Sequence, residues 1–139
     1  MKAVLACGGR RWGERLWKDE VRPTWEAEWD ALWDLLDEVR KEHGVEVLLE
    51  GGARGADRCA RDWAKARKVP VRTFPADWEK LGNTAGVLRN GEMCEALCTY
   101  PDRIAVTTPG GRGTADMCRR LRAAGVPILH VGSKQLSLL

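Results

Sequence analysis

The segment PGGRGTADM, residues 109–117, has the composition of a loop that holds an anion. It follows the apolar run RIAVTT, which is typical of a buried strand, and the helix after it is predicted to start near Thr114. Glycines let a ligand approach the backbone amides, and the free N–H groups of a helix start attract phosphate. Thr114 can cap the helix or bind the phosphate. The predicted phosphate loop consists of Pro109, Gly110, Gly111, Gly113 and Thr114.

Two more glycine-rich loops follow apolar runs. Gly8 and Gly9 come after residues 3–6, and Gly51 and Gly52 come after residues 45–49. One such turn would be explained by backbone geometry alone. Three of them at the ends of parallel strands favour a shared ligand site beyond the carboxyl edge of a sheet.

Arginines are concentrated near these loops. Guanidinium groups bind phosphate through a forked pair of hydrogen bonds, which lysine cannot copy. Arg10 and Arg54 lie in the loops and Arg89 lies near the start of a predicted helix, so all three are predicted to bind the ligand. Arg11 and Arg112 are interpreted as solvated surface residues.

Three further polar residues are candidates for the same site. Asn90 follows Arg89 and is predicted to contact the ligand. Asp57 and Asp116 lie near helix starts, where a carboxylate either stabilises the helix dipole or contacts a sugar hydroxyl.

Strands and helices alternate along the whole chain. This pattern predicts a single domain over residues 1–139, an α/β Rossmann-like three-layer α/β/α sandwich with a parallel sheet of about five strands in the order 3-2-1-4-5. The predicted strands are 3–6, 45–49, 70–74, 103–108 and 127–131. The predicted helices are 23–43, 56–68, 87–99 and 114–125.

Composition narrows the cellular context. The net charge is +3, with both signs interspersed, so it does not by itself require nucleic acid. The first apolar run is too short for a signal peptide or a membrane span, and we expect a cytoplasmic protein without membrane association.

The five cysteines are expected to be reduced. Cys94 and Cys98 are one helical turn apart but have no histidine at ligand spacing, so no metal is predicted.

The seven tryptophans fall into two groups. Trp25, Trp29 and Trp33 recur at helical spacing, which is typical of a core stripe or a dimer interface. Trp12 and Trp78 lie in predicted loops at the ligand end, where they either pack or stack on a base.

Four motifs, GGARGAD, FPADW, AGVLRNGEM and PGGRGTADM, resemble in order and spacing those of the YspA-type, YpsA-related branch of the SLOG superfamily. The resemblance runs from the first strand to the last. The superfamily includes the LOG phosphoribohydrolases and the DprA DNA-processing proteins. Resemblance to it implies a Rossmann-like fold that binds nucleotides or nucleotide-derived ligands.

The chain departs from the LOG enzymes at two positions. Those enzymes cleave an N-glycosidic bond with an arginine in RKxxM and a glutamate in PGGxGTxxE. Arg89 matches the arginine, but Met117 occupies the glutamate position and cannot transfer a proton. The adjacent Asp116 points about 100° away around the helix. Glu50 stands where relatives often have histidine, and a carboxylate there can act as general base or contact a ribose hydroxyl.

These features lead to one main hypothesis and two alternatives. The main one is binding of a nucleoside monophosphate or an ADP-ribose-like molecule, with Arg89 as counter-charge and no cofactor. The first alternative is an N-glycosidic hydrolase in which Arg89, Glu50 and Asp116 are catalytic. Single-stranded nucleic acid binding is a lesser alternative, because no basic stripe runs along any predicted helix. We expect a homo-oligomer, in the simplest case a dimer, because of the tryptophan-rich helix and because the family resemblance implies one.

Overall fold

The computed structural model describes residues 2–132 and 136–137. Its strands are β1 (Lys2–Cys7), β2 (Leu16–Trp17), β3 (Glu20–Val21), β4 (Val47–Glu50), β5 (Val71–Thr73), β6 (Asp102–Thr107), β7 (Ile128–His130) and β8 (Leu136–Ser137). Its helices are α1 (Trp25–Glu42), α2 (Ala56–Ala66), α3 (Trp78–Leu81), the 3-10 turn η1 (Gly82–Thr84), α4 (Ala85–Leu97) and α5 (Arg112–Ala123).

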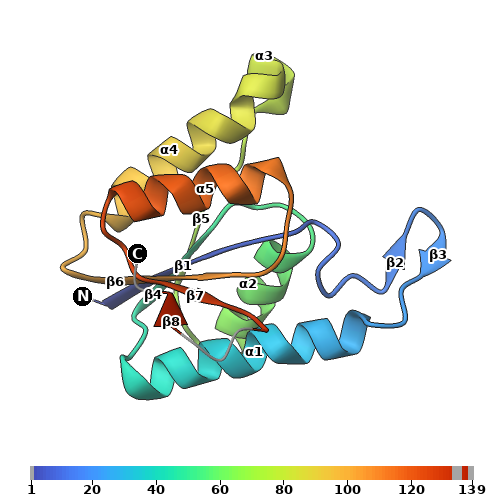
Figure 1. The fold of residues 1–139 in the computed structure, drawn as a ribbon, viewed down its shortest axis with the longest axis horizontal. Helices are drawn as coiled ribbons and strands as arrows, with labels where there is room; N and C mark the ends of the chain where they lie inside the picture. Colours follow the sequence, from blue (N-terminus) through green and yellow to red (C-terminus); the bar gives the residue numbers. More distant parts are fainter. Residues whose placement is uncertain (1, 133–135, 138–139) are drawn as a thin grey trace.

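The central sheet has the strand order β5-β4-β1-β6-β7-β8 (Figure 1). The strands from β5 to β7 pair in parallel, while β8 pairs antiparallel with β7. The predicted Rossmann-like fold and the strand order 3-2-1-4-5 are therefore confirmed. The short edge strand β8 was not predicted from the sequence.

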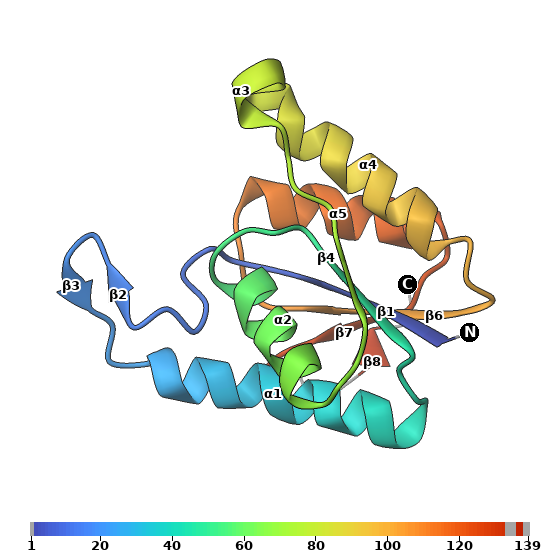
Figure 2. The same ribbon diagram turned by 180° about the vertical axis from the view of Figure 1, so that it is seen from behind.

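Helices cover both faces of the sheet, with α4 and α5 on one face and α1 and α2 on the other (Figures 1 and 2). Side chains alternate along β1 to serve both layers. Leu5 is buried in the cluster under α4 and α5, whereas Val4 is buried in the cluster over α1 and α2. Burial on both faces explains why the strand reads as a continuous apolar run.

The first helix packs through the stripe seen in its sequence. Leu32, Leu36 and Val39 are buried, and Trp29 and Trp33 pack against the same cluster with their ring centroids 5.7 Å apart. The indole N–H of Trp33 donates to the carbonyl of Cys59 on α2 at 3.1 Å. These two tryptophans thus pack against the core, as the core interpretation predicts.

A two-stranded hairpin, β2–β3, projects from the main body between β1 and α1 (Figure 1). Lys18 and Asp19 at its tip both have positive φ angles, as a type I′ hairpin turn requires. The hairpin was not predicted, because this turn lacks the usual Asn-Gly or Asp-Gly signal.

Across residues 2–132 and 136–137, no helix is both long and apolar enough to cross a membrane.

Candidate functional site

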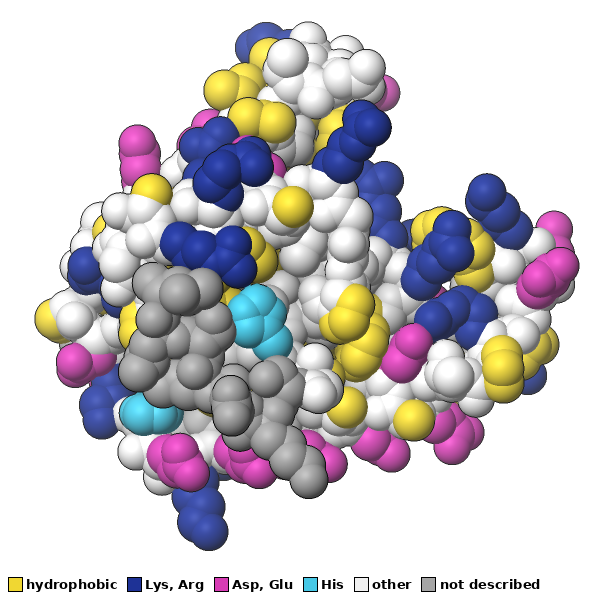
Figure 3. Space-filling model, viewed as in Figure 1, with side chains coloured by type: hydrophobic (Ala, Val, Ile, Leu, Met, Phe, Trp, Pro, Cys, Tyr) yellow, Lys and Arg dark blue, Asp and Glu magenta, His cyan; other side chains and the backbone are white. Residues whose placement is uncertain are grey.

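A pocket of about 1040 Å³ lies beyond the carboxyl ends of β1 and β6. The loops after these strands form its floor, α3 and α4 form one wall, and the segment leading into the β2–β3 hairpin forms the other. Figure 3 shows it from the side as a notch between α3 and the hairpin, with Lys and Arg side chains on both sides. The position matches the predicted reversal of strand order between β1 and β6.

The two floor loops are joined to each other. The amide of Gly9 donates to the carbonyl of Pro109 at 3.0 Å and lies 3.1 Å from the hydroxyl oxygen of Thr108. A Cβ on Gly8 would collide with the Thr108 side chain, and a Cβ on Gly9 would collide with the Pro109 carbonyl. These two glycines therefore let the loops pack together, a role separate from ligand approach.

The PGGRGT segment enters α5 earlier in the sequence than predicted. The helix starts at Arg112 with Gly111 as N-cap and no side-chain cap, so the alternative that Thr114 caps the helix is wrong. The first helical hydrogen bond comes from the amide of Ala115 to the carbonyl of Gly111 at 3.1 Å. The amides of residues 112–114 thus lie in the first turn of α5, where no carbonyl of the helix can accept a hydrogen bond from them.

Gly111 and Gly113 have no packing reason to be glycine. A Cβ at either position would meet no atom within 4 Å, and neither has a positive φ. Both line the pocket. Their small size leaves the backbone of the helix start open on the pocket side.

Arg89 lies one turn inside α4 and lines the pocket. Its Nη1 donates to the carbonyl of Gly51 at 2.6 Å, and its Nε donates to the amide oxygen of Asn90 at 3.1 Å. A Cβ on Gly51 would collide with the guanidinium group. Arg89 is therefore fixed at the pocket with its charge directed toward the loops.

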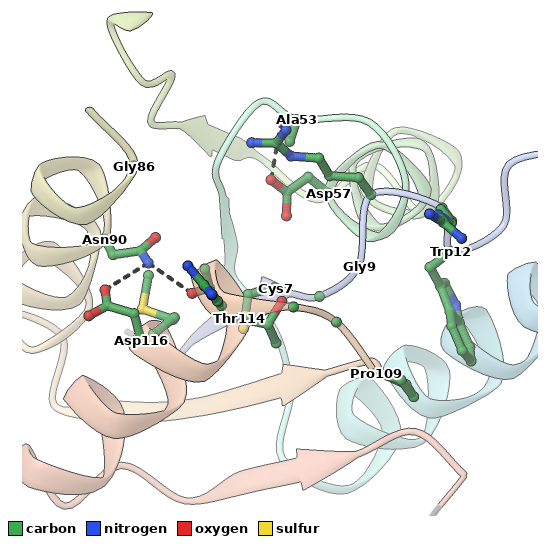
Figure 4. Close-up of a pocket in the computed structure, with 18 of the residues that line it drawn as sticks. Cys7, Gly9, Trp12, Ala53, Asp57, Gly86, Asn90, Pro109, Thr114 and Asp116 are labelled. Carbon is green, nitrogen blue, oxygen red and sulfur yellow. Dashed lines mark hydrogen bonds between the residues drawn. The ribbon is translucent and has the colours of Figure 1, made fainter. Parts of the chain in front are cut away.

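Asn90 connects α4 to the PGGRGT segment (Figure 4). Its amide nitrogen donates to the carbonyl of Gly113 at 3.1 Å and to Asp116 Oδ2 at 3.0 Å. Asp116 also accepts from Arg119 and Arg120 on its own helix, each at 2.9 Å. Burial raises the pKa of Asp116, but the hydrogen bonds from Asn90 and Arg120 outweigh this and hold it below its ordinary value. Asp116 is thus an ionised brace of α5, unsuited to act as an acid near neutral pH.

Glu50 does not line the pocket. It is fully buried, and its carboxylate accepts hydrogen bonds from Arg61 Nη1 and the amide of Gly52, both at 2.8 Å, and from the Thr73 hydroxyl. The structure places Gly51, Gly52 and Arg54 outside the pocket lining as well. Arg54 instead pairs with the buried Glu14 at 3.0 Å.

Asp57 is the acidic residue of the pocket lining whose pKa is raised. It is buried at the start of α2, lines the pocket, and accepts a hydrogen bond from the amide of Ala53 at 3.2 Å. Burial, and next the charge of Glu50, raise the pKa of Asp57 to about 6, although Arg89 and backbone amides oppose the shift. A pocket carboxyl with such a pKa can exchange a proton near neutral pH.

The α3 wall presents an aromatic surface. Trp78 is 48% exposed and lines the pocket, with the guanidinium carbon of Arg10 5.4 Å from its ring centroid. Gly86 lets the Trp78 ring pack closely on α4, since a Cβ on Gly86 would lie only 3.1 Å from that ring. The predicted placement of Trp78 and Arg10 at the ligand end is thus consistent with the structure.

The hairpin wall was largely missed by sequence reasoning. Trp17, Arg22 and Glu28 line the pocket there, together with Trp12 and Arg11. Arg22 forms a paired contact with Glu28, with both nitrogen–oxygen distances 2.7 Å, and this fixes the hairpin base to α1. The spacing of Arg22 and Glu28 was a possible signal, but only the unforeseen hairpin gives it meaning.

The sequence matches the model of the YspA, cpYpsA-related SLOG family over residues 2–81, more than half of the chain. The chain belongs to this family. Membership of the SLOG family suggests nucleotide-related binding or processing. The matched span includes β1, β4 and the glycine-rich loops after them, while the PGGRGT segment lies beyond it.

A curated relative is also similar along most of the chain. Gene 61 protein of Mycobacterium phage D29 is 39% identical over 129 residues, which cover 88% of this chain and 94% of the phage protein. The similarity between the two proteins therefore extends past residue 81, where the match to the family model ends. No solved structure matches.

Proposed function

We propose that this SLOG protein binds a nucleotide or nucleotide-derived ligand, with a phosphate on the backbone amides of the PGGRGT loop. The observation that carries the proposal is the open helix start at Gly111 and Gly113, whose glycines no internal contact requires. Arg89 supplies a fixed positive charge to the same floor.

A planar base is the natural neighbour of that phosphate. Trp78 offers an exposed ring on the α3 wall, and Arg10 already stacks on it. Aromatic rings and guanidinium groups stack on the faces of bases, and this stacking depends little on which base is present. A nucleoside monophosphate or an ADP-ribose-like molecule has both groups.

Binding without cleavage is favoured over hydrolysis of the N-glycosidic bond. Met117 stands at the position of the LOG glutamate, Glu50 is sequestered by Arg61 and Gly52, and Asp116 is held ionised by Asn90 and Arg120. The proton-transfer residues of the hydrolase hypothesis are thus absent or engaged elsewhere.

One observation keeps N-glycosidic hydrolysis as a second candidate. Asp57 lines the pocket, and its raised pKa of about 6 suits a general acid or base. In a hydrolase, Asp57 rather than Glu50 would be the group that exchanges a proton.

Native mass spectrometry of the protein incubated with AMP and with ADP-ribose separates the two functions. An intact bound ligand with no released adenine supports the binding function. Free adenine that increases with protein concentration, and disappears in Asp57→Asn, would establish the hydrolase. Neither ligand bound and no base released would contradict both.

A further inference from the structure

The hairpin wall contains two buried hydrogen-bond donors without acceptors. Within the described part of the chain, the indole nitrogens of Trp12 and Trp17 are the buried side-chain polar atoms that have no partner. The buried indole of Trp63, by contrast, donates to Asp37 at 2.8 Å. Because buried polar groups in proteins are normally paired, two unpaired donors in one pocket wall need an explanation.

The same wall carries positive charge near its rim. The guanidinium carbons of Arg11 and Arg54 lie 5.1 Å and 5.8 Å from the centroid of the Trp17 ring. Arg54 pairs with Glu14, but within residues 2–132 and 136–137 no carboxylate lies within ion-pair distance of Arg11. Arg11 is exposed and covers the Trp17 ring, so its guanidinium group can turn toward a ligand, whereas Glu14 holds Arg54 in place.

Hydrogen bonds fix the backbone segment that carries Trp12 and Trp17. Glu28 accepts from the amide of Gly13 at 3.0 Å in addition to its paired contact with Arg22. Arg22 also donates to the carbonyl of Glu14 at 3.1 Å. These bonds hold the segment that carries Trp12 and Trp17 in one position against α1, as a preorganised binding surface requires.

We propose that the Trp12, Trp17 and Arg11 side chains form a second subsite, which binds an acceptor-rich group at the far end of the ligand. Its chemistry suits a second phosphate or the hydroxyl groups of a sugar. This inference rests on the proposed function, because it takes the first phosphate to lie on the PGGRGT loop. The natural ligand is then two-ended, with its base on Trp78 and its second polar group on the hairpin wall.

Indole ¹H–¹⁵N NMR spectra test the subsite directly, with the two resonances assigned from Trp12→Phe and Trp17→Phe. We expect ADP-ribose to shift both resonances downfield, and AMP to leave them in place. If ADP shifts them equally, the second phosphate occupies the subsite; if only ADP-ribose does, the sugar does. Either result supports the proposal. Shifts of the same size with AMP, or none with ADP and ADP-ribose, would overturn it.

Affinity measurements with the same variants give an independent readout. Phenylalanine keeps an aromatic ring but removes the N–H donor, so each variant should bind ADP-ribose about tenfold more weakly and AMP as the wild type does. Trp33→Phe, which changes an indole on α1 outside the pocket lining, is the matched control and should bind both ligands normally. Equal losses for both ligands, or no loss for either, would contradict the subsite. If the wild type binds neither ligand, the proposed function itself fails.

Discussion

The guanidinium group of Arg89 on α4 and the backbone carbonyl of Gly51 after β4 are joined by a 2.6 Å hydrogen bond. This contact brings a positive charge beside the buried carboxyl group of Asp57 and opposes the rise in its pKa. Arg89 therefore has two effects at the pocket: it places a positive charge there, and it favours the ionised form of Asp57.

Asp57 should make the stability of the protein fall between about pH 4 and pH 6. The folded-state pKa of about 6 exceeds the ordinary value, so the folded protein binds more protons than the unfolded chain in this range. Stability is then highest below the unfolded pKa and lower by about 3 kcal/mol above the folded pKa. Urea unfolding from pH 4 to pH 8 measures this, and Asp57→Asn should remove this component.

Arg89→Met sharpens the same experiment. Without the guanidinium charge, the pKa of Asp57 should rise further, so the pH dependence should extend above pH 6. Equal pH profiles for wild type and Asp57→Asn would show that another group is responsible.

Gly113→Ala should separate stability from binding. The new Cβ meets no atom in the fold but extends from the backbone of the phosphate loop, which lines the pocket. We expect the free energy of unfolding to stay the same or rise by at most about 1 kcal/mol, because alanine favours helix. Binding of AMP by calorimetry should weaken at least tenfold. Gly91→Ala, in α4 and outside the pocket lining, is the control and should bind AMP normally, since its Cβ would meet only the flexible end of Arg120 at 3.3 Å.

Trp78→Ala should weaken AMP binding by about tenfold or more, since base stacking contributes about 1–3 kcal/mol. Trp78→Phe should recover much of the loss because it keeps an aromatic face. The side chain is about half exposed, so neither change should lower the melting temperature by more than a few degrees. Unchanged affinity in Trp78→Ala would place the base elsewhere in the pocket.

Glu50→Gln should act on stability. The substitution leaves Arg61 without its charged partner in a buried site and should cost about 3 kcal/mol, at the low end for buried pairs because Arg61 is partly exposed. Arg61→Gln is the reciprocal variant, and the double variant should lose less than the sum of the two. AMP affinity of the folded variants should be normal. A stable Glu50→Gln protein that fails to bind or cleave the nucleotide would make Glu50 a site residue after all.

The sequence predicted the features that depend on local patterns. Apolar runs such as residues 3–6 and 103–108 located central strands, and the glycines of PGGRGT located the pocket floor. The position of Glu50 was not predictable in this way, because its neighbours Arg61 and Thr73 come from other elements and turn its carboxylate away from the pocket mouth. The hairpin wall was not predicted, because Lys18 and Asp19 form a hairpin turn although their residue types do not favour one.

The position of β6 beside β1 has a consequence for shortened forms of the protein. A chain that stops near residue 81 keeps β1, β4 and β5 but lacks β6, which pairs with β1 from Lys2 to Cys7. The backbone N–H and C=O groups on one side of this apolar strand would then lie open to solvent. Such an unprotected edge pairs readily with other chains, so a truncated product should aggregate rather than persist as a half-domain.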